Sequence, residues 1–266
     1  MNNKKQLIVV FDMDECIGYW SFGGLVYNIY KYINIHQKKR AIYLFNKYII
    51  KHLIRPRLDT LFKWLYKLKK KNIIKYIFLY TSNIAIDYPN FIIKCIEQYI
   101  NTIGLFDNIF VSHLPRQSNQ FGFKDLNCIS NKYNYIQFPY NNVIIFDDRI
   151  DVWDKSCRHR IVKVPIYKKT SEINIKAFKL DLNKYFKIDK YKLVALYNNQ
   201  LYYPNFYKNK LNIYSINQLL HLLSNGQKKN IKINDDIVFT LMYTKIKQFI
   251  KSNQNITLDD WIIRKY

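Results

Sequence analysis

The sequence predicts an α/β protein built on a doubly wound parallel β-sheet. Short apolar runs, each the length of a buried strand, recur over residues 7 to about 165 and alternate with stretches of helical periodicity. Three of these runs stop directly at a polar residue that can carry chemistry. The strand–helix alternation is typical of parallel, doubly wound sheets, whose strands are covered by helices on both faces.

The expected strands are apolar almost throughout, which fits burial on both faces of a sheet. In chain order they are residues 6–11, 76–80, 108–111, 143–146 and 161–164. A helix is expected after Arg55, because Leu58, Leu61, Phe62, Leu65 and Leu68 recur at helical spacing. Further helices are expected over 90–103 and 235–250, the latter packing through Ile237, Leu241, Ile246 and Phe249.

Two stretches are less regular. Residues 19–54 are rich in aromatic residues and lysine, and we expect their second half to be helical. Residues 171–235 are polar, rich in Asn and Tyr, and only weakly periodic. With 266 residues, of which 49% are apolar, the chain is long enough for one α/β domain and an extension.

The net charge is strongly positive, at +24 from 43 Lys and Arg against 19 Asp and Glu. Such a charge favours polyanionic partners, namely nucleic acid, phosphorylated proteins or acidic membrane surfaces. An AT-rich coding sequence gives the same surplus of Lys, Asn, Ile and Tyr, so codon bias is an equally good explanation. No apolar stretch is long enough for a transmembrane helix, and the N-terminal run is too short for a signal peptide.

The polar residues at the strand ends are Asp12, Thr81 and Asp147. Sites in open α/β sheets lie beyond the carboxyl ends of the strands, so we expect these three side chains to converge. Each alone has an ordinary structural explanation, since an Asp after a strand is often a helix cap. Their shared position at three strand ends makes the combination more specific than any one motif.

Four carboxylates are expected near this point, because Asp14 follows Asp12 and Asp148 follows Asp147. Carboxylates crowded together repel unless a cation neutralises them. Mg²⁺ is the natural choice, since it takes a few carboxylates together with water and phosphate oxygens. Lys124 lies between two expected strands and would supply a compensating positive charge.

Five motifs resemble those of the haloacid-dehalogenase (HAD) superfamily and, more narrowly, of the FCP/SCP phosphatases that act on the C-terminal domain of RNA polymerase II. In chain order they are VVFDMDECIG, RPRLDTLFKWL, FLYTSN, FKDL and VIIFDDRIDVW. The resemblance implies a HAD-like Rossmannoid sheet within a phosphatase domain of residues 1–170. Residues 19–54 would form a flap insertion after the first strand, and residues 171–266 a C-terminal extension of unassigned function.

The resemblance also implies a role for each site residue. Asp12 would be the nucleophile that forms an aspartyl-phosphate, and Asp14 the general acid and base. Thr81 and Lys124 would hold the phosphoryl oxygens. Asp12, the Asp14 backbone carbonyl and Asp148 would bind Mg²⁺, with Asp147 beside them.

The chain departs from the family pattern in two places. Cys16 stands where the family has Thr, which removes a hydroxyl hydrogen bond, and residues 19–54 match no flap sequence. A cysteine mechanism is not indicated, because no histidine is paired with Cys16. Trp20, Trp64 and Trp153 are interpreted as packing residues, and Arg149 and Asp151 as a local pair or a helix cap.

The resulting prediction is a Mg²⁺-dependent protein serine/threonine phosphatase acting on a phosphopeptide like the polymerase tail. The alternatives are a non-catalytic binding module of the same fold and a nucleic-acid end phosphatase. The expected partners are a phosphoprotein substrate and, through the basic surface, nucleic acid. The four cysteines form no C-x-x-C pair, so the expected location is a reducing compartment, the nucleus or cytoplasm, including that of an infected cell.

Overall fold

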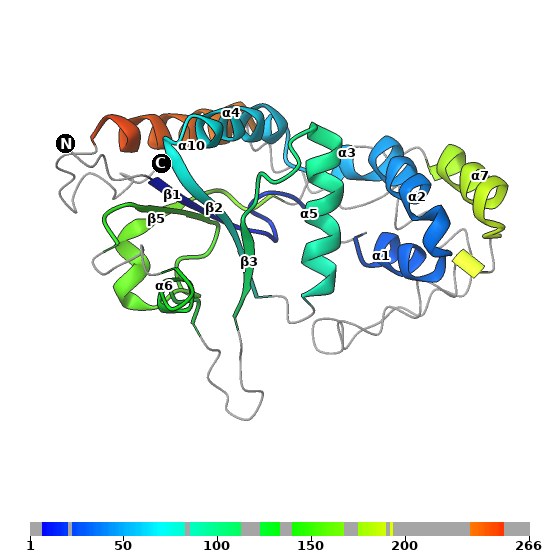
Figure 1. Ribbon diagram of the computed structural model, residues 1–266, viewed down its shortest axis with the longest axis horizontal. Helices are drawn as coiled ribbons and strands as arrows, with labels where there is room; N and C mark the ends of the chain where they lie inside the picture. The colour runs from blue at the N-terminus through cyan, green and yellow to red at the C-terminus, as the bar shows by residue number, and fades with distance from the viewer. Residues whose placement is uncertain are drawn as a thin grey trace, which may run out of the picture.

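The computed structural model is an α/β fold around one five-stranded sheet, which confirms the predicted fold class (Figure 1). It describes residues 7–20, 23–82, 86–112, 123–133, 140–167, 175–189, 192–193 and 235–252. All strand pairs are parallel, and the strand order is β3-β2-β1-β4-β5. The strands are β1 (Leu7–Asp12), β2 (Ile74–Thr81), β3 (Asn108–Val111), β4 (Val143–Asp147) and β5 (Ile161–Lys163).

Strand β1 lies at the centre of the sheet, between β2 and β4. Every one of its residues is buried, as expected for a strand covered by helices on both faces. Its register pairs Phe11 with Leu79 on β2 and with Phe146 on β4. Asp12, Thr81 and Asp147 are therefore the final residues of neighbouring strands, as the sequence predicts.

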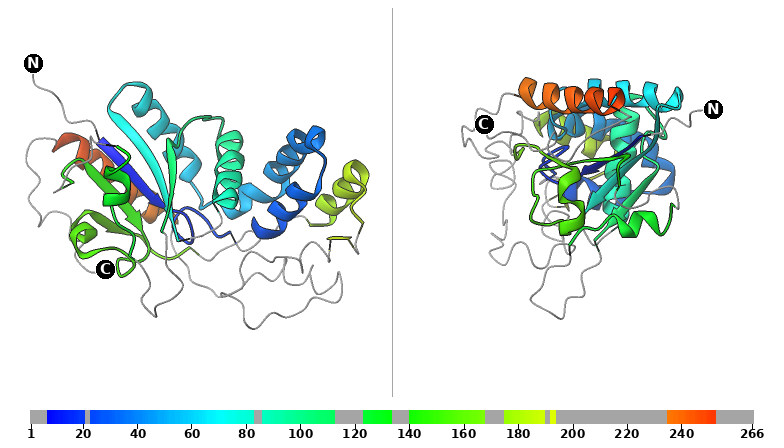
Figure 2. Two further views of the ribbon diagram at one scale, coloured as in Figure 1. Left: turned by 60° about the horizontal axis from the view of Figure 1, so that its bottom comes forward. Right: turned by 90° about the vertical axis from the view of Figure 1, so that its left-hand side faces the viewer.

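The helices cover the sheet on two faces, as Figure 2 shows in side view. Helices α4 (Leu58–Lys70) and α5 (Asp87–Ile100) connect β1 to β2 and β2 to β3 on one face. The chain then returns past β1 and adds β4 on its other side, with the short helix α6 (Asn127–Ser130) on the opposite face. The crossover direction thus reverses between β1 and β4, which is where open sheets place their sites.

Helix α10 (Asp235–Lys251) covers β4 and lies beside α4 (Figure 1). Its buried face consists of Val238, Met242, Ile246 and Phe249. The predicted helix is therefore present, but its packing face was wrong in part. Ile237 is 62% exposed, because the apolar stripe begins one residue later at Val238.

The insertion after β1 is helical along most of its length. It contains α1 (Gly23–Tyr32), the 3-10 helix η1 (Ile35–Gln37), α2 (Lys38–Phe45), the π-helix η2 (Asn46–Ile50) and α3 (Lys51–Leu53). These helices lie beside α5, to the right of the sheet in Figure 1. Helices also form before the second half of the 19–54 stretch, to which the sequence analysis assigned them.

Helix α7 (Ile175–Phe186) lies against this insertion rather than against the sheet (Figure 1). Phe178 contacts the rings of Phe45 and Tyr48, and the Tyr48 hydroxyl donates to Asp181 at 2.8 Å. Residues 171–235 were expected to be weakly periodic, yet Phe178, Leu182 and Phe186 form a regular buried stripe. Residues 194–234 lie outside the described part of the chain, and the division at residue 170 stays a prediction.

No helix in the described ranges is both long enough and apolar enough to cross a bilayer. The four cysteines are unpaired, and three of them are buried.

Candidate active site at the carboxyl edge of the sheet

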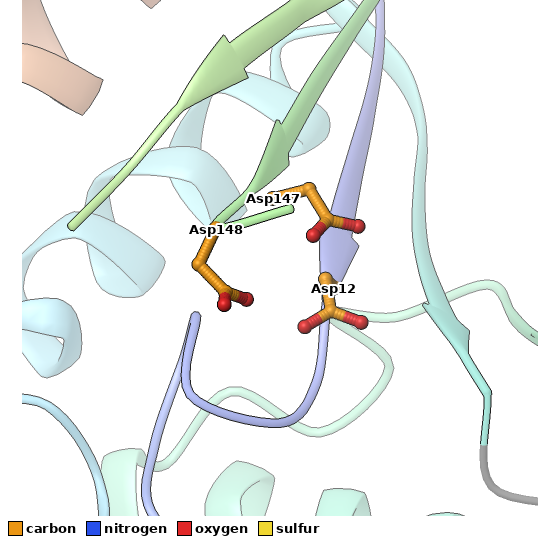
Figure 3. A group of neighbouring side chains, drawn as sticks. All are labelled: Asp12, Asp147 and Asp148. Carbon is orange, nitrogen blue, oxygen red and sulfur yellow. The ribbon is translucent and has the colours of Figure 1, made fainter. Parts of the chain in front are cut away.

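Three buried carboxylates meet where β1 and β4 end. Asp12 is the last residue of β1, Asp147 is the last residue of β4, and Asp148 follows it. One carboxylate oxygen from each lies within 4.8 Å of the other two. Figure 3 shows the three side chains directed toward one another across the gap between the two strand ends.

Lys124 reaches into this cluster from the segment between β3 and β4. Its ammonium group lies 2.5 Å from Asp12 Oδ1 and 2.8 Å from Asp147 Oδ2. Its backbone pairs with the segment after β4, since Lys124 N donates to Val152 O and Asp154 N donates to Lys124 O. Lys124 is 2% exposed, so the ion pairs are shielded from water and rigidly placed.

Asp14 and Thr81 lie beside the cluster and contact each other. The Thr81 hydroxyl donates to Asp14 Oδ2 at 3.4 Å. The Asp14 carboxylate is not among the three that gather closely, and the role of its backbone carbonyl as a metal ligand stays a prediction. The structure thus brings all six predicted site residues to one edge of the sheet.

The pKa values of Asp14 and Asp148 are raised, so these two groups are harder to ionise than ordinary carboxylates. Burial raises the pKa of Asp14 to about 6, although Lys124 and Thr81 oppose the shift. Burial and the neighbouring Asp147 charge raise the pKa of Asp148 to about 6. Burial alone would lower the pKa of Lys124, but the Asp12 and Asp147 carboxylates raise it above its usual range. Lys124 is therefore a permanent cation.

The donor set fits a divalent metal ion. Within the described residues, one ammonium group, that of Lys124, pairs with two of the three clustered carboxylates, those of Asp12 and Asp147. Oxygen-only donors with excess negative charge suit Mg²⁺. Asp147 already accepts hydrogen bonds from Lys124 and Trp153 on Oδ2 and from the Arg149 backbone on Oδ1. Asp12 and Asp148 therefore have more free oxygen capacity for a metal than Asp147 has.

The loop that carries Asp12 and Asp14 is fixed by contacts on several sides. The Trp20 indole donates to Met13 O at 3.0 Å, and its ring packs so closely on Gly18 that a Cβ there would lie 2.4 Å from it. Glu15 has a positive φ of 62°, which costs energy for a residue with a side chain. Its carbonyl accepts from buried Arg55 at 2.9 Å and from Tyr167 N at 2.8 Å.

Cys16 has a structural rather than a chemical role. Its thiol donates to Phe146 O at 3.3 Å, so Cys16 makes a hydrogen bond to β4. Burial and the nearby Asp12 charge raise the pKa of the Cys16 thiol, which keeps it neutral. A neutral thiol is a poor nucleophile, in agreement with the sequence analysis.

Trp153 contributes more than the packing that the sequence analysis assigned to it. It is fully buried, and its indole N–H donates to Asp147 Oδ2 at 2.7 Å, the oxygen that also binds Lys124. The spacing from Asp147 to Trp153 gave no sign of this bond, because the chain turns between them. Trp20 was interpreted as packing in the same way and also proves to be a hydrogen-bond donor. Arg149 and Asp151 form the expected local pair at 2.5 Å.

No family model and no curated protein matches this chain. A search of solved structures returns one described as a putative beta-phosphoglucomutase from Thermotoga maritima. The match has a TM-score of 0.35 and 14% sequence identity, over 65% of this chain and 91% of that one. A likeness of this degree carries no argument about the function of this chain.

Proposed function

We propose that this protein is a Mg²⁺-dependent phosphatase that works through a phosphorylated Asp12. The observation that carries the proposal is the convergence of Asp12, Asp147 and Asp148 around buried Lys124 at the switch point of the sheet. Crowding buried carboxylates is costly, and a site for a divalent cation and a phosphoryl group accounts for that cost. The motif resemblance to the HAD superfamily supports the same chemistry.

In the first step, an Asp12 oxygen attacks phosphorus and the bond from phosphorus to the ester oxygen breaks. Asp14, whose pKa is raised to about 6, gives its proton to the departing oxygen. In the second step, Asp14 takes a proton from a water molecule that attacks phosphorus. Inorganic phosphate leaves and the Asp12 carboxylate is restored.

The remaining groups stabilise charge. We assign Lys124 and Thr81 to binding of the phosphoryl oxygens, and their contacts with Asp12 and Asp14 support this role. Asp12, Asp148 and the Asp14 carbonyl would hold Mg²⁺, which would supply electrostatic stabilisation of the phosphoryl oxygens. Trp153 keeps Asp147 in place, and Asp147 in turn positions Lys124.

For the substrate class, we propose phosphoserine or phosphothreonine in a protein, as in a polymerase-tail peptide. This finer assignment is supported by the resemblance of RPRLDTLFKWL and VIIFDDRIDVW to FCP/SCP motifs. Hydrolysis of a terminal phosphate on nucleic acid is the alternative that a substrate panel must compare with it.

The test is hydrolysis of an aryl phosphate with Mg²⁺, with a chelator, and with the Asp12→Asn variant. We expect Mg²⁺-dependent turnover that falls by at least roughly 10³-fold in the variant, because Asn cannot form the phosphorylated intermediate. Equal melting temperatures would show that the variant is folded. Wild-type rates in Asp12→Asn would remove Asp12 as nucleophile, and no turnover on any phosphoester would favour a binding module.

A further inference from the structure

The insertion after β1 contains no acidic residue. From Glu15 to Asp59 the chain has no Asp or Glu, while cations occur throughout that interval. We use the name flap lobe for residues 23–54 together with α7, which packs on them. The cations of residues 23–54 are Lys31, Lys38, Lys39, Arg40, Lys47 and Lys51.

Helix α7 changes this balance very little. It brings one acid, Asp181, which is half-buried and already engaged by Lys47 at 3.7 Å and by the Tyr48 hydroxyl at 2.8 Å. The same helix adds Lys176, Lys179 and Lys184. Within the described residues, the flap lobe therefore carries many more cations than acids, and such a surface attracts polyanions.

Tyrosine rings lie among these cations. Tyr43 is 61% exposed and Tyr32 is 46% exposed. Cations lie over other tyrosine faces, with Lys38 4.7 Å from the Tyr30 centroid and the Arg40 guanidinium 3.7 Å from that of Tyr185. Surfaces that bind single-stranded nucleic acid combine exposed aromatic rings with cations. The bases stack on the rings, and the phosphates pair with the cations.

We infer that the flap lobe binds single-stranded nucleic acid. This inference goes beyond the proposed function and does not depend on it, because the lobe lies outside the carboxylate cluster. The exposed rings of Tyr43 and Tyr32 favour nucleic acid over a phosphorylated peptide as the partner, because bases can stack on them while the cations pair with backbone phosphates.

Codon bias explains the surplus of lysine but not the absence of acids. Aspartate and glutamate are used elsewhere in this chain, including the sheet edge that directly precedes the lobe. Burial does not exclude them either, because Lys39, Tyr43, Lys47 and Lys51 are exposed. The charge asymmetry is therefore a property of this surface and calls for a partner of opposite charge.

The test measures binding of a fluorescently labelled oligo-dT to the full chain by anisotropy, in chelator, over a range of salt concentrations. The variant Lys39→Gln/Lys51→Gln removes two exposed cations for which the described residues provide no ion pair. We expect roughly tenfold weaker binding and a log–log salt slope reduced by about 1.4, from about 0.7 for each phosphate contact on a single strand. Tyr43→Ala, made alone, should also weaken binding but leave the salt slope at its wild-type value, because this substitution removes stacking and no charge.

The matched control is Lys63→Gln/Lys67→Gln, which removes the same charge from exposed positions on α4. It should bind oligo-dT nearly as the wild type does, and melting curves should show all variants folded. The inference is overturned if the wild type shows no salt-dependent binding or if the control loses as much affinity as the lobe variant. It is also overturned, in favour of a phosphopeptide, if an acidic phosphopeptide of equal charge competes better than unlabelled oligo-dT. If the wild-type protein binds oligo-dT as expected but does not hydrolyse any phosphoester, that result contradicts the proposed function and leaves this inference standing.

Discussion

The carboxyl edge of the sheet carries buried negative charges, whereas the flap lobe carries exposed positive charges. At the sheet edge, Asp12, Asp147 and Asp148 are buried around one ammonium group. In the lobe, Lys39 and Lys51 are exposed to solvent, and no acid in the described part of the chain forms an ion pair with them. Buried like charges cost stability and persist when a function requires them, whereas exposed charges cost little and can accumulate without selection.

This difference decides how each region must be tested. A functional role for the sheet edge can be argued from the site itself. Its short ion-pair contacts and its raised pKa values have no ordinary structural benefit. The lobe can be argued only from contrast with other surfaces of the same chain, which is why its test depends on a control of equal charge. The experiments below should affect one region and leave the other unchanged.

Replacement of Asp148 should produce the largest separation of the two regions. Asp148→Ala removes a proposed metal ligand, so we expect Mg²⁺ affinity to fall by at least roughly 100-fold, with Asp148→Asn intermediate because it keeps one oxygen. Without metal, the Asp148→Ala variant should melt at a higher temperature than the wild type. The raised pKa of Asp148 shows that its charge is unfavourable in the folded state, and the variant removes that charge.

The measurements are isothermal titration with Mg²⁺ and thermal melting in chelator at pH 8, where Asp148 is ionised. Oligo-dT binding should not change. A variant with wild-type Mg²⁺ affinity would place the metal elsewhere in the chain.

Loss of the Phe178 ring should affect mainly the lobe. Phe178 is 3% exposed and anchors α7 to Phe45 and Tyr48. Phe178→Ala should cost about 3 kcal/mol of local stability. Hydrogen exchange should become faster in α2, η2 and α7, and stay slow in β1 and β4. Equal acceleration in the sheet would show that the lobe and the sheet unfold as one unit.

Trp153→Phe should produce a smaller, purely catalytic effect. Phe keeps most of the buried aromatic volume but loses the indole N–H bond to Asp147 Oδ2. We expect kcat to fall by about tenfold with a small change in KM, because Asp147 and Lys124 are held less firmly. Oligo-dT binding again serves as the reference. A raised KM with unchanged kcat would argue that Trp153 does not position Lys124 through Asp147.

The sheet could be predicted from sequence because each buried strand appears as a short, continuous run of apolar residues. Runs such as residues 143–146 are apolar and stop at an acid, and parallel strands place such acids at one edge. The predicted convergence of Asp12 and Asp147 therefore needed no knowledge of side-chain contacts. Lys124 was found through its motif, since one lysine among so many is uninformative alone.

Contacts between distant segments could not be predicted in this way. The seating of α7 on the insertion depends on Phe178 meeting Phe45, and no local pattern encodes a partner so far away. The bond from Trp153 to Asp147 depends on a turn whose path is set by pairing with Lys124. The first half of the α10 packing face was assigned one residue early, because Ile237 and Val238 are both apolar and only the neighbouring helix and strand decide between them, whereas Ile246 and Phe249 are buried as predicted.

The position of α10 has a consequence for the order in which the protein matures on the ribosome. This helix covers Ile144 and Phe146 of β4, yet it is synthesised long after β4 has emerged. Until then the strand that presents Asp147 has one bare apolar face, which nascent-chain chaperones can recognise. Completion of the layer behind the carboxylate cluster is thereby tied to translation of a distant segment, and a ribosome stalled before residue 235 would hold a chain whose sheet lacks one covering helix.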